Sequence, residues 1–423
     1  MSQPVLIAGA GWLAEPNLQK LLAALSAGGE EARIAGGAVR NTLLGEPVSD
    51  IDIATTNLPD QTISRAAKAG FKTVPTGKEH GTITVIAEGR PFEVTTLRAD
   101  IETDGRRAKV VFGRDWRQDA ERRDFTINAL YAEADGTIVD LVGGVADLES
   151  RTLRFIGNPE ARIREDYLRI LRFFRFFAWY GSGRPDAEGL KACARLKDGL
   201  SHLSAERIWG ELKKLLSASD PSRALLWMRQ TGVLTAILPE SEKWGIDAIP
   251  GLIAAERDLG WPADPLLRLE AIVPPGAERL AAMGERLRFA KAETERLTAW
   301  ATAPAPMAET SSAALAKLLY RHGRPGLRDR LRLALASARA NAISSDKALV
   351  AAGGFSRLLK DVEGWERPAF PLGGRDLAAL GVAPGKPLGD LLKALESEWV
   401  ESGFKLDRGA LLERAAGLVQ GGG

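Results

Sequence analysis

The chain has one cysteine, Cys193, and three histidines among its 423 residues. A lone cysteine excludes a disulfide framework and a cysteine-based zinc site, and it is typical of a reducing cytoplasm. His80, His202 and His322 are too scattered to suggest a metal site. None of them is followed by aspartate, so an appended His-Asp phosphohydrolase domain is not expected.

A strong charge of one sign and a long apolar run are also missing. Lys and Arg number 57 against 55 Asp and Glu, a net charge of +2, so contact with nucleic acid would have to come from local basic patches. No apolar run approaches the roughly 18 residues that span a bilayer, and the first residues carry no basic segment typical of a secretion signal. We therefore expect a cytoplasmic protein with no membrane association and no implied protein partner.

A glycine pair and two aspartates form the first motif. Gly36 and Gly37 precede a short helical pattern, and Asp50 and Asp52 follow it. On a strand these two aspartates would share one face. Adjacent carboxylates repel unless a cation neutralises them, and Mg²⁺ is commonly held by carboxylates together with substrate phosphates. The glycines would let the backbone approach a triphosphate closely. An isolated aspartate pair is also common in solvated loops.

The second motif, residues 119–131, contains two adjacent arginines. The spacing predicts a helix with Arg122 and Arg123 at its start, where the positive end of the helix dipole would help them hold phosphates. Asp124 and Asn128 would share a face and could hold a ribose through its hydroxyls. Taken alone, the pattern fits an exposed charged helix start equally well.

The third motif lies within a helix expected over residues 160–180. Glu165 and Asp166 precede Arg169 by four and three residues, so both would neighbour it, as in an ordinary solvated salt bridge. The pattern also suits base selection. Cytosine and adenine present an amino donor beside a ring-nitrogen acceptor, whereas uracil and guanine present the reverse. An Asp acceptor beside an Arg donor would match C and A and reject U and G.

Together the three motifs resemble the signature of the polymerase-β-type nucleotidyltransferases, most closely the bacterial (class II) tRNA CCA-adding enzymes and their poly(A) polymerase relatives. The resemblance implies that Asp50 and Asp52 bind Mg²⁺. It also implies that Asp166 and Arg169 act as a protein template for the incoming base, with Glu165 orienting Arg169. The family usually has Asp where this chain has Asn41. The implied nucleotide-binding residues are Gly36, Gly37, Arg40, Arg122, Arg123, Asp124, Asn128, Glu165, Asp166 and Arg169.

The resemblance implies an α+β polymerase-β-type nucleotidyltransferase head, a small mixed sheet with helices, followed by an all-α neck, body and tail. The sequence agrees, because short apolar runs and glycine turns give way to helical periodicity after about residue 157. The expected domains are an N-terminal helical segment (1–27), the head (28–145), a neck and RNA-binding helical domain (146–240) and a helical body and tail (241–423). The expected elements are a first helix at 17–25, strands at 83–86 and 92–97, and helices at 160–180, 204–216, 222–231, 266–287 and 310–335.

The implied activity is template-independent addition of CCA to the 3′ end of tRNA, with CTP and ATP as substrates, Mg²⁺ as cofactor and tRNA as partner. The terminal 3′-hydroxyl would attack the α-phosphate and release pyrophosphate. A poly(A) polymerase shares all three motifs but usually carries a more basic C-terminal extension. A catalytically silent tRNA-binding module is disfavoured by the intact aspartate pair and the third motif. The order of C and A addition stays open.

Three further features are candidates for a functional role. Glu93, on an expected strand, is either a third catalytic carboxylate or a structural residue. The polar segment 98–118 is typical of a mobile loop near an active site, and the resemblance implies that it accompanies the switch from C to A addition. A basic helix between residues 317 and 339 either follows a tRNA backbone or is a solvated face. Its candidate RNA-binding residues are Lys317, Arg321, Arg324 and Arg328.

Overall fold

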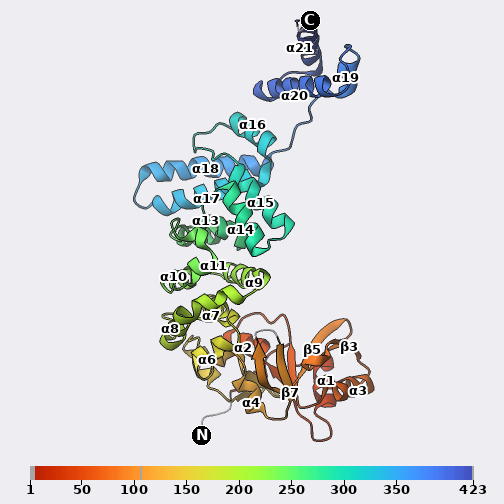
Figure 1. Cartoon of the computed structure of the whole chain (residues 1–423), viewed down its shortest axis with the longest axis vertical. Helices are drawn as coiled ribbons and strands as arrows, with labels where there is room; N and C mark the ends of the chain where they lie inside the picture. The colour runs from red at the N-terminus through yellow and green to blue at the C-terminus, as the bar shows by residue number, and fades with distance from the viewer. Residues whose placement is uncertain (1–4, 105–106, 422–423) are drawn as a thin grey trace. The chain divides into compact units, whose positions relative to one another are not determined.

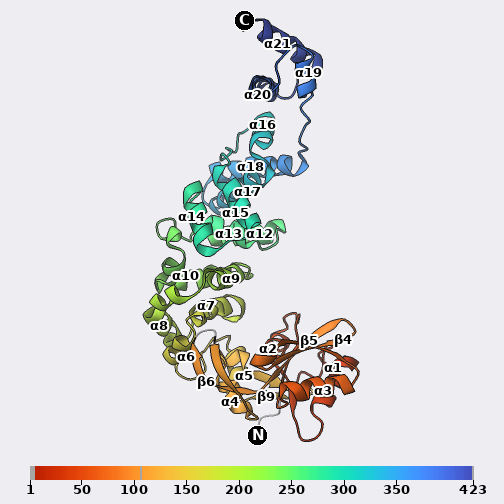
Figure 2. The same cartoon turned by 45° about the vertical axis from the view of Figure 1, so that its right-hand side comes forward.

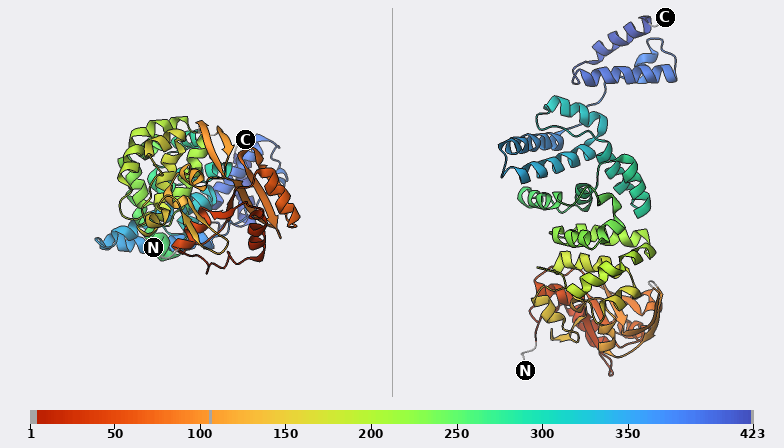
Figure 3. Two further views of the ribbon diagram at one scale, coloured as in Figure 1. Left: turned by 90° about the horizontal axis from the view of Figure 1, so that it is seen from below. Right: turned by 60° about the vertical axis from the view of Figure 1, so that its left-hand side comes forward.

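The computed structural model describes residues 5–104 and 107–421. The chain divides into two units, one ending at Pro239 and one beginning at Glu240 (Figure 1). In Figure 3 the strands are confined to the first third of the chain, and the remainder is helical. The expected fold class, a mixed sheet with helices followed by an all-α region, is confirmed.

A seven-stranded mixed sheet forms the head of the first unit. Its strands lie in the order β3-β4-β5-β2-β1-β8-β9, and only β2 and β5 pair in parallel. A separate two-stranded sheet contains β6 and β7. The strands are β1 (Ala32–Ala35), β2 (Asp52–Thr55), β3 (Lys72–Gly77), β4 (Thr82–Ala87), β5 (Arg90–Thr96), β6 (Arg98–Asp104), β7 (Arg107–Phe112), β8 (Leu130–Ala132) and β9 (Ile138–Asp140).

The hairpin β4–β5 shows how the sequence determines these strands. Buried and partly exposed residues alternate along β4, with Ile83 and Val85 fully buried, the period expected of a half-buried strand. The turn consists of Glu88 and Gly89, with φ of 48° and 83°, which is the backbone that favoured two-residue hairpin loops require. The prediction of two strands around this turn is confirmed.

Helices flank the sheet and then continue the chain. The expected first helix is confirmed as α1, which packs against α3 and β1 (Figure 2). The α-helices of the first unit are α1 (Pro16–Leu25), α2 (Gly37–Leu44), α3 (Pro59–Lys68), α4 (Trp116–Glu121), α5 (Gly144–Glu149), α6 (Pro159–Glu165), α7 (Leu168–Tyr180), α8 (Ala187–Leu196), α9 (Ala205–Leu216), α10 (Ser222–Gln230) and α11 (Val233–Ile237). Four short 3₁₀ segments are η1 (Lys78–His80), η2 (Thr126–Asn128), η3 (Lys197–His202) and η4 (Pro239–Ser241).

An aromatic cluster joins the head to α7. Phe125, in the second motif, lies 4.9 Å from Phe155 and 5.4 Å from Phe176 between ring centroids. Phe173 stacks on Phe155 at 5.3 Å. Because Phe125, Phe155 and Phe173 are almost fully buried, this packing fixes α7 against the segment that carries the second motif.

Three long helices expected from the sequence are interrupted. Residues 160–180 form α6 and α7, separated at Asp166, whose backbone is extended (φ −158°, ψ 108°). Residues 266–287 are divided at Pro274 and Pro275, which lie between α13 and α14, so the break that this proline pair indicates in the sequence is confirmed. Residues 310–335 are divided at Gly323, which has φ of 76° and precedes Arg324-Pro325. Glycine in this region of φ ends the first helix, and proline favours the first turn of the next.

The segment 98–118 is not an irregular loop. It forms the hairpin β6–β7 and the start of α4, with Gly105 and Arg106 outside the described residues. The β-branched and aromatic residues in Val110-Val111-Phe112 favour a strand, although the segment as a whole is polar.

The second unit is helical. Leu315, Leu331 and Leu358 belong to one apolar core, with residues from α16, α17 and α18, and Leu377, Leu395 and Leu411 belong to another, with residues from α19, α20 and α21. Among the described residues, no helix is long and apolar enough to cross a membrane. The α-helices of this unit are α12 (Ala248–Leu259), α13 (Pro265–Ile272), α14 (Ala277–Leu287), α15 (Lys291–Thr302), α16 (Ser312–His322), α17 (Arg324–Asn341), α18 (Asp346–Gly364), α19 (Gly374–Ala378), α20 (Lys386–Glu401) and α21 (Arg408–Gly421).

Candidate active site

A cleft of about 490 Å³ in the first unit brings residues of all three motifs together. Arginines dominate its lining and aspartates are fewer, so the cleft is suited to an anionic ligand. Of the predicted catalytic and nucleotide-binding residues, Asp50, Glu93 and Glu165 are not part of the lining. The lining residues are Gly36, Gly37, Arg40, Asp52, Arg98, Arg122, Arg123, Asp124, Asn128, Asp166, Leu168, Arg169, Arg172, Phe176 and Arg207.

Asp52 begins strand β2, and Asp50 lies in the segment just before it. The intervening Ile51 is buried, so the backbone directs the two aspartates away from the core. In the parallel pairing of β2 with β5, Asp52 is opposite Glu93. The sequence predicts Glu93 on a strand that could face the aspartates. The pairing of β2 with β5 brings Glu93 beside Asp52.

The three carboxylates affect one another. Partial desolvation and the negative charges of Glu93 and Asp50 raise the pKa of the Asp52 carboxyl, and Arg123 opposes the rise. Within the described residues, neither Asp52 nor Glu93 has an ion-pair partner, and no group of three or more His, Cys, Asp and Glu side chains is arranged to hold a metal by itself. Two repelling oxygen ligands at the edge of a cleft fit a divalent cation that completes its shell with substrate phosphates.

The glycine turn fits closely under the cleft. Gly36 has φ of +64° and ψ of −108°, a conformation that L side chains rarely adopt. A Cβ atom here would lie 3.3 Å from the carbonyl oxygen of Asn128. Gly36 and Gly37 therefore bring the first turn of α2, with its unpaired N–H groups, to the surface of the cleft.

Arg40 lies beneath this turn and is 7% exposed. Its guanidinium donates to Asn128 Oδ1, to the Tyr180 hydroxyl at 2.9 Å and to Asn41 Oδ1 at 3.0 Å. Desolvation lowers the pKa of Arg40, and the Tyr180 hydroxyl opposes the shift. Arg40 is thus engaged in joining α2 to α7, while Asn41, where the family usually has Asp, orients it as a neutral acceptor.

The second motif does not begin a helix, so that expectation is wrong. Arg122 caps the C-terminal end of α4, and Arg123 follows it. The negative end of the α4 dipole attracts these arginines and gives no help in binding phosphate. The buried carboxylate of Asp119 fixes both, at 2.6 Å from Arg122 and 3.1 Å from Arg123, and also accepts from the Tyr131 hydroxyl at 2.7 Å.

Asp124 and Asn128 are neighbours without being on an α-helix. The Asn128 amide donates to Asp124 Oδ1 at 3.0 Å, and Arg172 of α7 donates to Asp124 Oδ2 at 2.7 Å. Burial would raise the pKa of Asp124, but Arg172 and the hydrogen bond from Asn128 outweigh it and hold the pKa below its usual value. Both residues line the cleft as a fixed polar pair.

The third motif spans the break between α6 and α7, so the prediction of one continuous helix is wrong. Arg169 donates to Glu165 and, at 2.9 Å, to the carbonyl of Arg162. Asp166 does not pair with Arg169. Its Oδ2 accepts from Arg207 at 2.6 Å, and its Oδ1 accepts from the backbone N–H of Leu168 at 3.1 Å. This second bond satisfies the N–H of the first residue of α7.

Sequence reasoning missed several residues of the cleft. Arg172 follows Arg169 by three residues, so helical spacing could have found it. Asp119, which holds two lining arginines, lies within the second motif, but its burial is not evident from the sequence pattern. Arg207 had no local signal, because only the packing of α9 on α7 brings it to Asp166.

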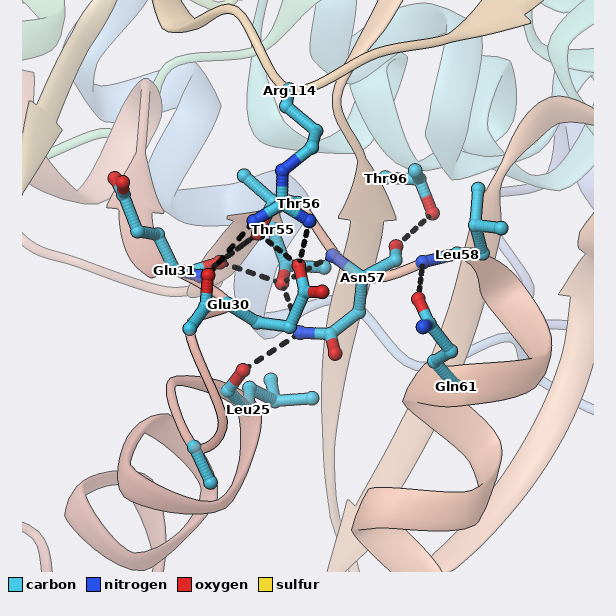
Figure 4. Close-up of polar contacts among 12 residues, drawn as sticks. Leu25, Glu30, Glu31, Thr55, Thr56, Asn57, Leu58, Gln61, Thr96 and Arg114 are labelled. Atoms are coloured by element: carbon cyan, nitrogen blue, oxygen red, sulfur yellow. Dashed lines mark hydrogen bonds and ion pairs between the residues drawn. The ribbon is translucent and has the colours of Figure 1, made fainter.

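Close to this cleft, the hairpin β6–β7 is anchored at its base (Figure 4). Arg114, just after β7, donates to Glu30 at 2.6 Å and to the Gly29 carbonyl at 2.8 Å. Glu30 also accepts from Thr56, at the end of β2, at 2.6 Å. Trp116 donates to Glu31 at 2.7 Å. These contacts connect the end of the hairpin to the strands that carry the first motif.

The predicted RNA-binding cations lie in the second unit, on α16 and α17 rather than on one helix. Lys317 and Arg321 both pair with Glu401 of α20, and Arg324 donates to the Trp365 carbonyl. Arg328 is beside the buried carboxylate of Asp329, at 3.8 Å. Lys317, Arg321 and Arg324 are thus engaged by hydrogen bonds within the protein.

Comparisons with known proteins agree with this geometry. A family model for the poly A polymerase head domain matches residues 32–154, and one for a probable RNA and SrmB-binding site of polymerase A matches 184–244. The mitochondrial CCA tRNA nucleotidyltransferase 1 of Mus musculus is 34% identical, over 90% of this chain and 86% of its own length. The CCA-adding enzyme of Levilactobacillus brevis is 33% identical, over 95% and 96%.

Among solved structures, the Bacillus stearothermophilus CCA-adding enzyme in complex with CTP superposes with a TM-score of 0.69 and 27% identity, over 92% of this chain and 94% of that chain. The head fold and the arginine-lined cleft with its aspartates are those of a nucleotidyltransferase. Since the likeness extends over nearly the whole chain, this protein belongs to the family of CCA-adding tRNA nucleotidyltransferases.

Proposed function

We propose that this chain adds CCA to the 3′ end of tRNA without a nucleic-acid template, using CTP and ATP and releasing pyrophosphate. The observation that carries the proposal is the single cleft in which Asp52, the arginine pair Arg122 and Arg123, and the base-selecting candidates Asp166 and Arg169 meet. A relative with the same fold was solved with CTP, which supports a nucleoside triphosphate as the ligand of this cleft.

Asp50 and Asp52 are the proposed ligands of Mg²⁺, together with phosphate oxygens of the nucleotide. The bound ion would lower the pKa of the attacking 3′-hydroxyl and stabilise negative charge at the α-phosphate. Glu93, beside Asp52 in the sheet, is the proposed third catalytic carboxylate. It adds negative charge that favours the cation without having to coordinate it.

The triphosphate is assigned to Arg122, Arg123 and the glycine turn. Asp119 holds both arginines, and a held guanidinium loses little side-chain entropy when it binds phosphate. Gly37 contributes a backbone N–H group, whereas the N–H of Gly36 already donates to the Leu130 carbonyl at 2.8 Å. In this assignment Arg40 supports the site from beneath instead of contacting the nucleotide, because its donors are already engaged.

The base is assigned to Asp166 and Arg169. Asp166 already accepts two hydrogen bonds, and a carboxylate has room for more, so it can still accept from the amino group of cytosine or adenine. Arg169 is held by Glu165, and among the described residues its Nε donates to none. It remains available to a ring nitrogen. Asp124 and Asn128 are the proposed ribose contacts.

We further propose the domain bounds 1–27 for an N-terminal helical segment, whose helix α1 packs on β1 of the head, 28–145 for the head, 146–240 for an RNA-binding neck and 241–423 for body and tail. Residues 1–4 lie outside the described part of the chain. A cytoplasmic location is proposed from the single buried thiol of Cys193, and cell fractionation tests it.

The decisive experiment uses tRNA that ends before CCA, with labelled CTP and ATP supplied separately and together. We expect CC from CTP alone and CCA from both, and Asp52→Asn should lower both additions at least about a hundredfold. Asp60→Asn, an exposed aspartate of the same domain paired with Lys78, is the matched control and should retain activity. Long A-only extension would instead identify a poly(A) polymerase, and full activity of Asp52→Asn would refute the metal assignment.

A further inference from the structure

A second cavity, of about 540 Å³, lies within the second unit among α12, α13, α15 and α17. Its walls are mostly apolar and include Leu252 and Leu333. Trp244, at its rim, is 53% exposed. A cavity of this size accommodates a small organic molecule.

Two buried polar groups border this cavity without partners. Glu270 of α13 is 1% exposed, and within the described residues neither of its carboxyl oxygens has a hydrogen-bond partner. Trp300 of α15 is 2% exposed, and its indole Nε1 likewise has none. Leaving such groups unpaired in a protein interior is costly, so they are rare in native proteins. The two together point to a ligand that satisfies both.

Burial and the neighbouring charges determine the protonation state of Glu270. Burial and the nearby carboxylate of Asp329 raise the pKa of Glu270 well above its usual value, and Arg296 and Arg330 oppose the rise. Arg296 already binds Asp329 at 2.7 Å. Arg330 donates to the carbonyls of Trp300 and Ala301, at 3.0 and 3.1 Å. A protonated Glu270 offers one donor and one acceptor side by side.

We propose that this cavity binds a neutral, planar nitrogen heterocycle of the nucleobase type. Apolar walls bury the ring faces, Glu270 pairs with an adjacent donor and acceptor on one edge, and Trp300 donates to a ring nitrogen or carbonyl. A phosphate is disfavoured, because Glu270 and Asp247 line the cavity and its one lining cation, Arg330, is engaged among the described residues. The ligand is therefore a base or nucleoside.

This site lies entirely in the second unit and does not depend on nucleotidyl transfer. Its ligand is either a free nucleoside or a base of an RNA whose backbone stays outside. A free nucleoside and an RNA base present the same hydrogen-bonding edge to Glu270. A competition experiment between a nucleoside and tRNA can distinguish them.

Isothermal calorimetry of the full chain with adenosine, guanosine, cytidine and uridine tests the proposal. At least one should bind with one-to-one stoichiometry, and excess CTP with Mg²⁺ should not displace it. Trp300→Phe keeps the ring and removes the N–H, so affinity should fall about tenfold. Glu270→Leu should abolish binding, and Glu270→Gln, which retains a donor and an acceptor, should preserve it. CCA addition should be unchanged in all three variants.

Failure of all four nucleosides to bind would overturn the proposal and leave a solvent-filled cavity. Binding that survives Glu270→Leu would also overturn it. If Glu270→Leu does not fold, Trp300→Phe decides alone, and unchanged affinity there refutes the site. Displacement of the nucleoside by tRNA would identify an RNA base as the ligand, and no displacement would identify a free nucleoside. Either result supports the cavity as a nucleobase site.

Discussion

Arg207, near the start of α9, donates to Asp166 Oδ2 at 2.6 Å, although the two residues are 41 positions apart in the chain. The pair lies at the break between α6 and α7, where the backbone of Asp166 is extended and its carbonyl accepts from the N–H of Arg169 at 3.0 Å. Both side chains are about one-fifth exposed, so the contact is partly screened by water. Its consequence is orientation, because it fixes the carboxylate that we assign to the incoming base.

Replacing Arg207 should therefore affect base choice more than chemistry. We expect Arg207→Ala to lower kcat/KM for CTP and ATP about tenfold, the cost of one charge-assisted hydrogen bond, and to let UTP compete. Single-nucleotide incorporation assays with all four triphosphates measure both effects.

Two variants control this experiment. Arg207→Lys keeps a charge near Asp166 and should give an intermediate loss. Lys191→Ala removes an exposed lysine of α8 that pairs only with Glu188 among the described residues and should leave discrimination unchanged. If Arg207→Ala reduces rates without changing selectivity, Asp166 does not choose the base.

We expect replacement of Asp119 to lower both the stability of the protein and its affinity for the nucleotide. Burial would raise its pKa, but Arg123 and Arg122 together with the Tyr131 hydroxyl outweigh burial and lower the pKa. A carboxyl with a lowered folded-state pKa contributes stability that is present above its unfolded pKa of about 3.9 and is lost as the pH falls through the folded value. Asp119→Asn should thus cost about 3 kcal/mol at pH 7, and the difference should shrink below about pH 4.

Urea denaturation of wild type and Asp119→Asn at several pH values measures this effect. Tyr131→Phe removes only the hydroxyl donor and should be the milder change at every pH. A difference between wild type and Asp119→Asn that does not vary with pH would mean that the carboxylate charge is not what stabilises this cluster.

The sequence predicted those parts of the site that depend on residues close together in the chain. The turn at Gly36 and the aspartates around β2 depend on a few adjacent residues, whose spacing carries the information. Asp166 was placed on a helix because apolar spacing continues on both sides of it, and neither Asp166 nor Tyr167 is a residue that obliges a helix to end. Its partner Arg207 is brought in by helix packing, which local patterns do not encode.

In the second motif, too, the local sequence pattern did not determine the structure. Its apolar spacing fitted a helix start, but Phe125 pairs as an isolated bridge with Phe155, and a 3₁₀ turn follows. In so short a segment, periodicity cannot distinguish these structures. Aromatic packing decided the outcome, since Phe125 is fully buried among residues of α7.

Weakening the base of the β6–β7 hairpin should affect A addition selectively. Arg114→Ala removes the contacts to Glu30 and Gly29 and leaves the cleft residues unchanged. We expect CC addition to persist and the final A to slow severalfold, because the hairpin is expected to act in the switch between bases. Arg90→Ala, which removes a salt bridge to Glu15 elsewhere in the head, is the control. Equal slowing of C and A would assign the anchor to general folding.

Because basic residues of α16 and α17 make contacts within the protein, we expect them to contribute to its stability more than to tRNA binding. Since Lys317 and Arg321 share Glu401 and Arg324 holds the Trp365 carbonyl, replacing Arg321, Arg324 and Arg328 by Ala should lower the melting temperature. The salt dependence of tRNA binding should change little.

We expect the exposed Arg223 and Arg229 of α10, in contrast, to contribute to tRNA binding. They lie within the segment matched by the RNA-binding family model and have no partner among the described residues. Each phosphate contact contributes roughly 0.7 to 0.9 to the slope of log affinity against log salt, so the double Ala variant should lower that slope by between about one and two. Filter binding across a salt series measures both variants. A reduced slope in the α16–α17 triple variant, with none in the α10 double variant, would instead place the tRNA backbone on the second unit.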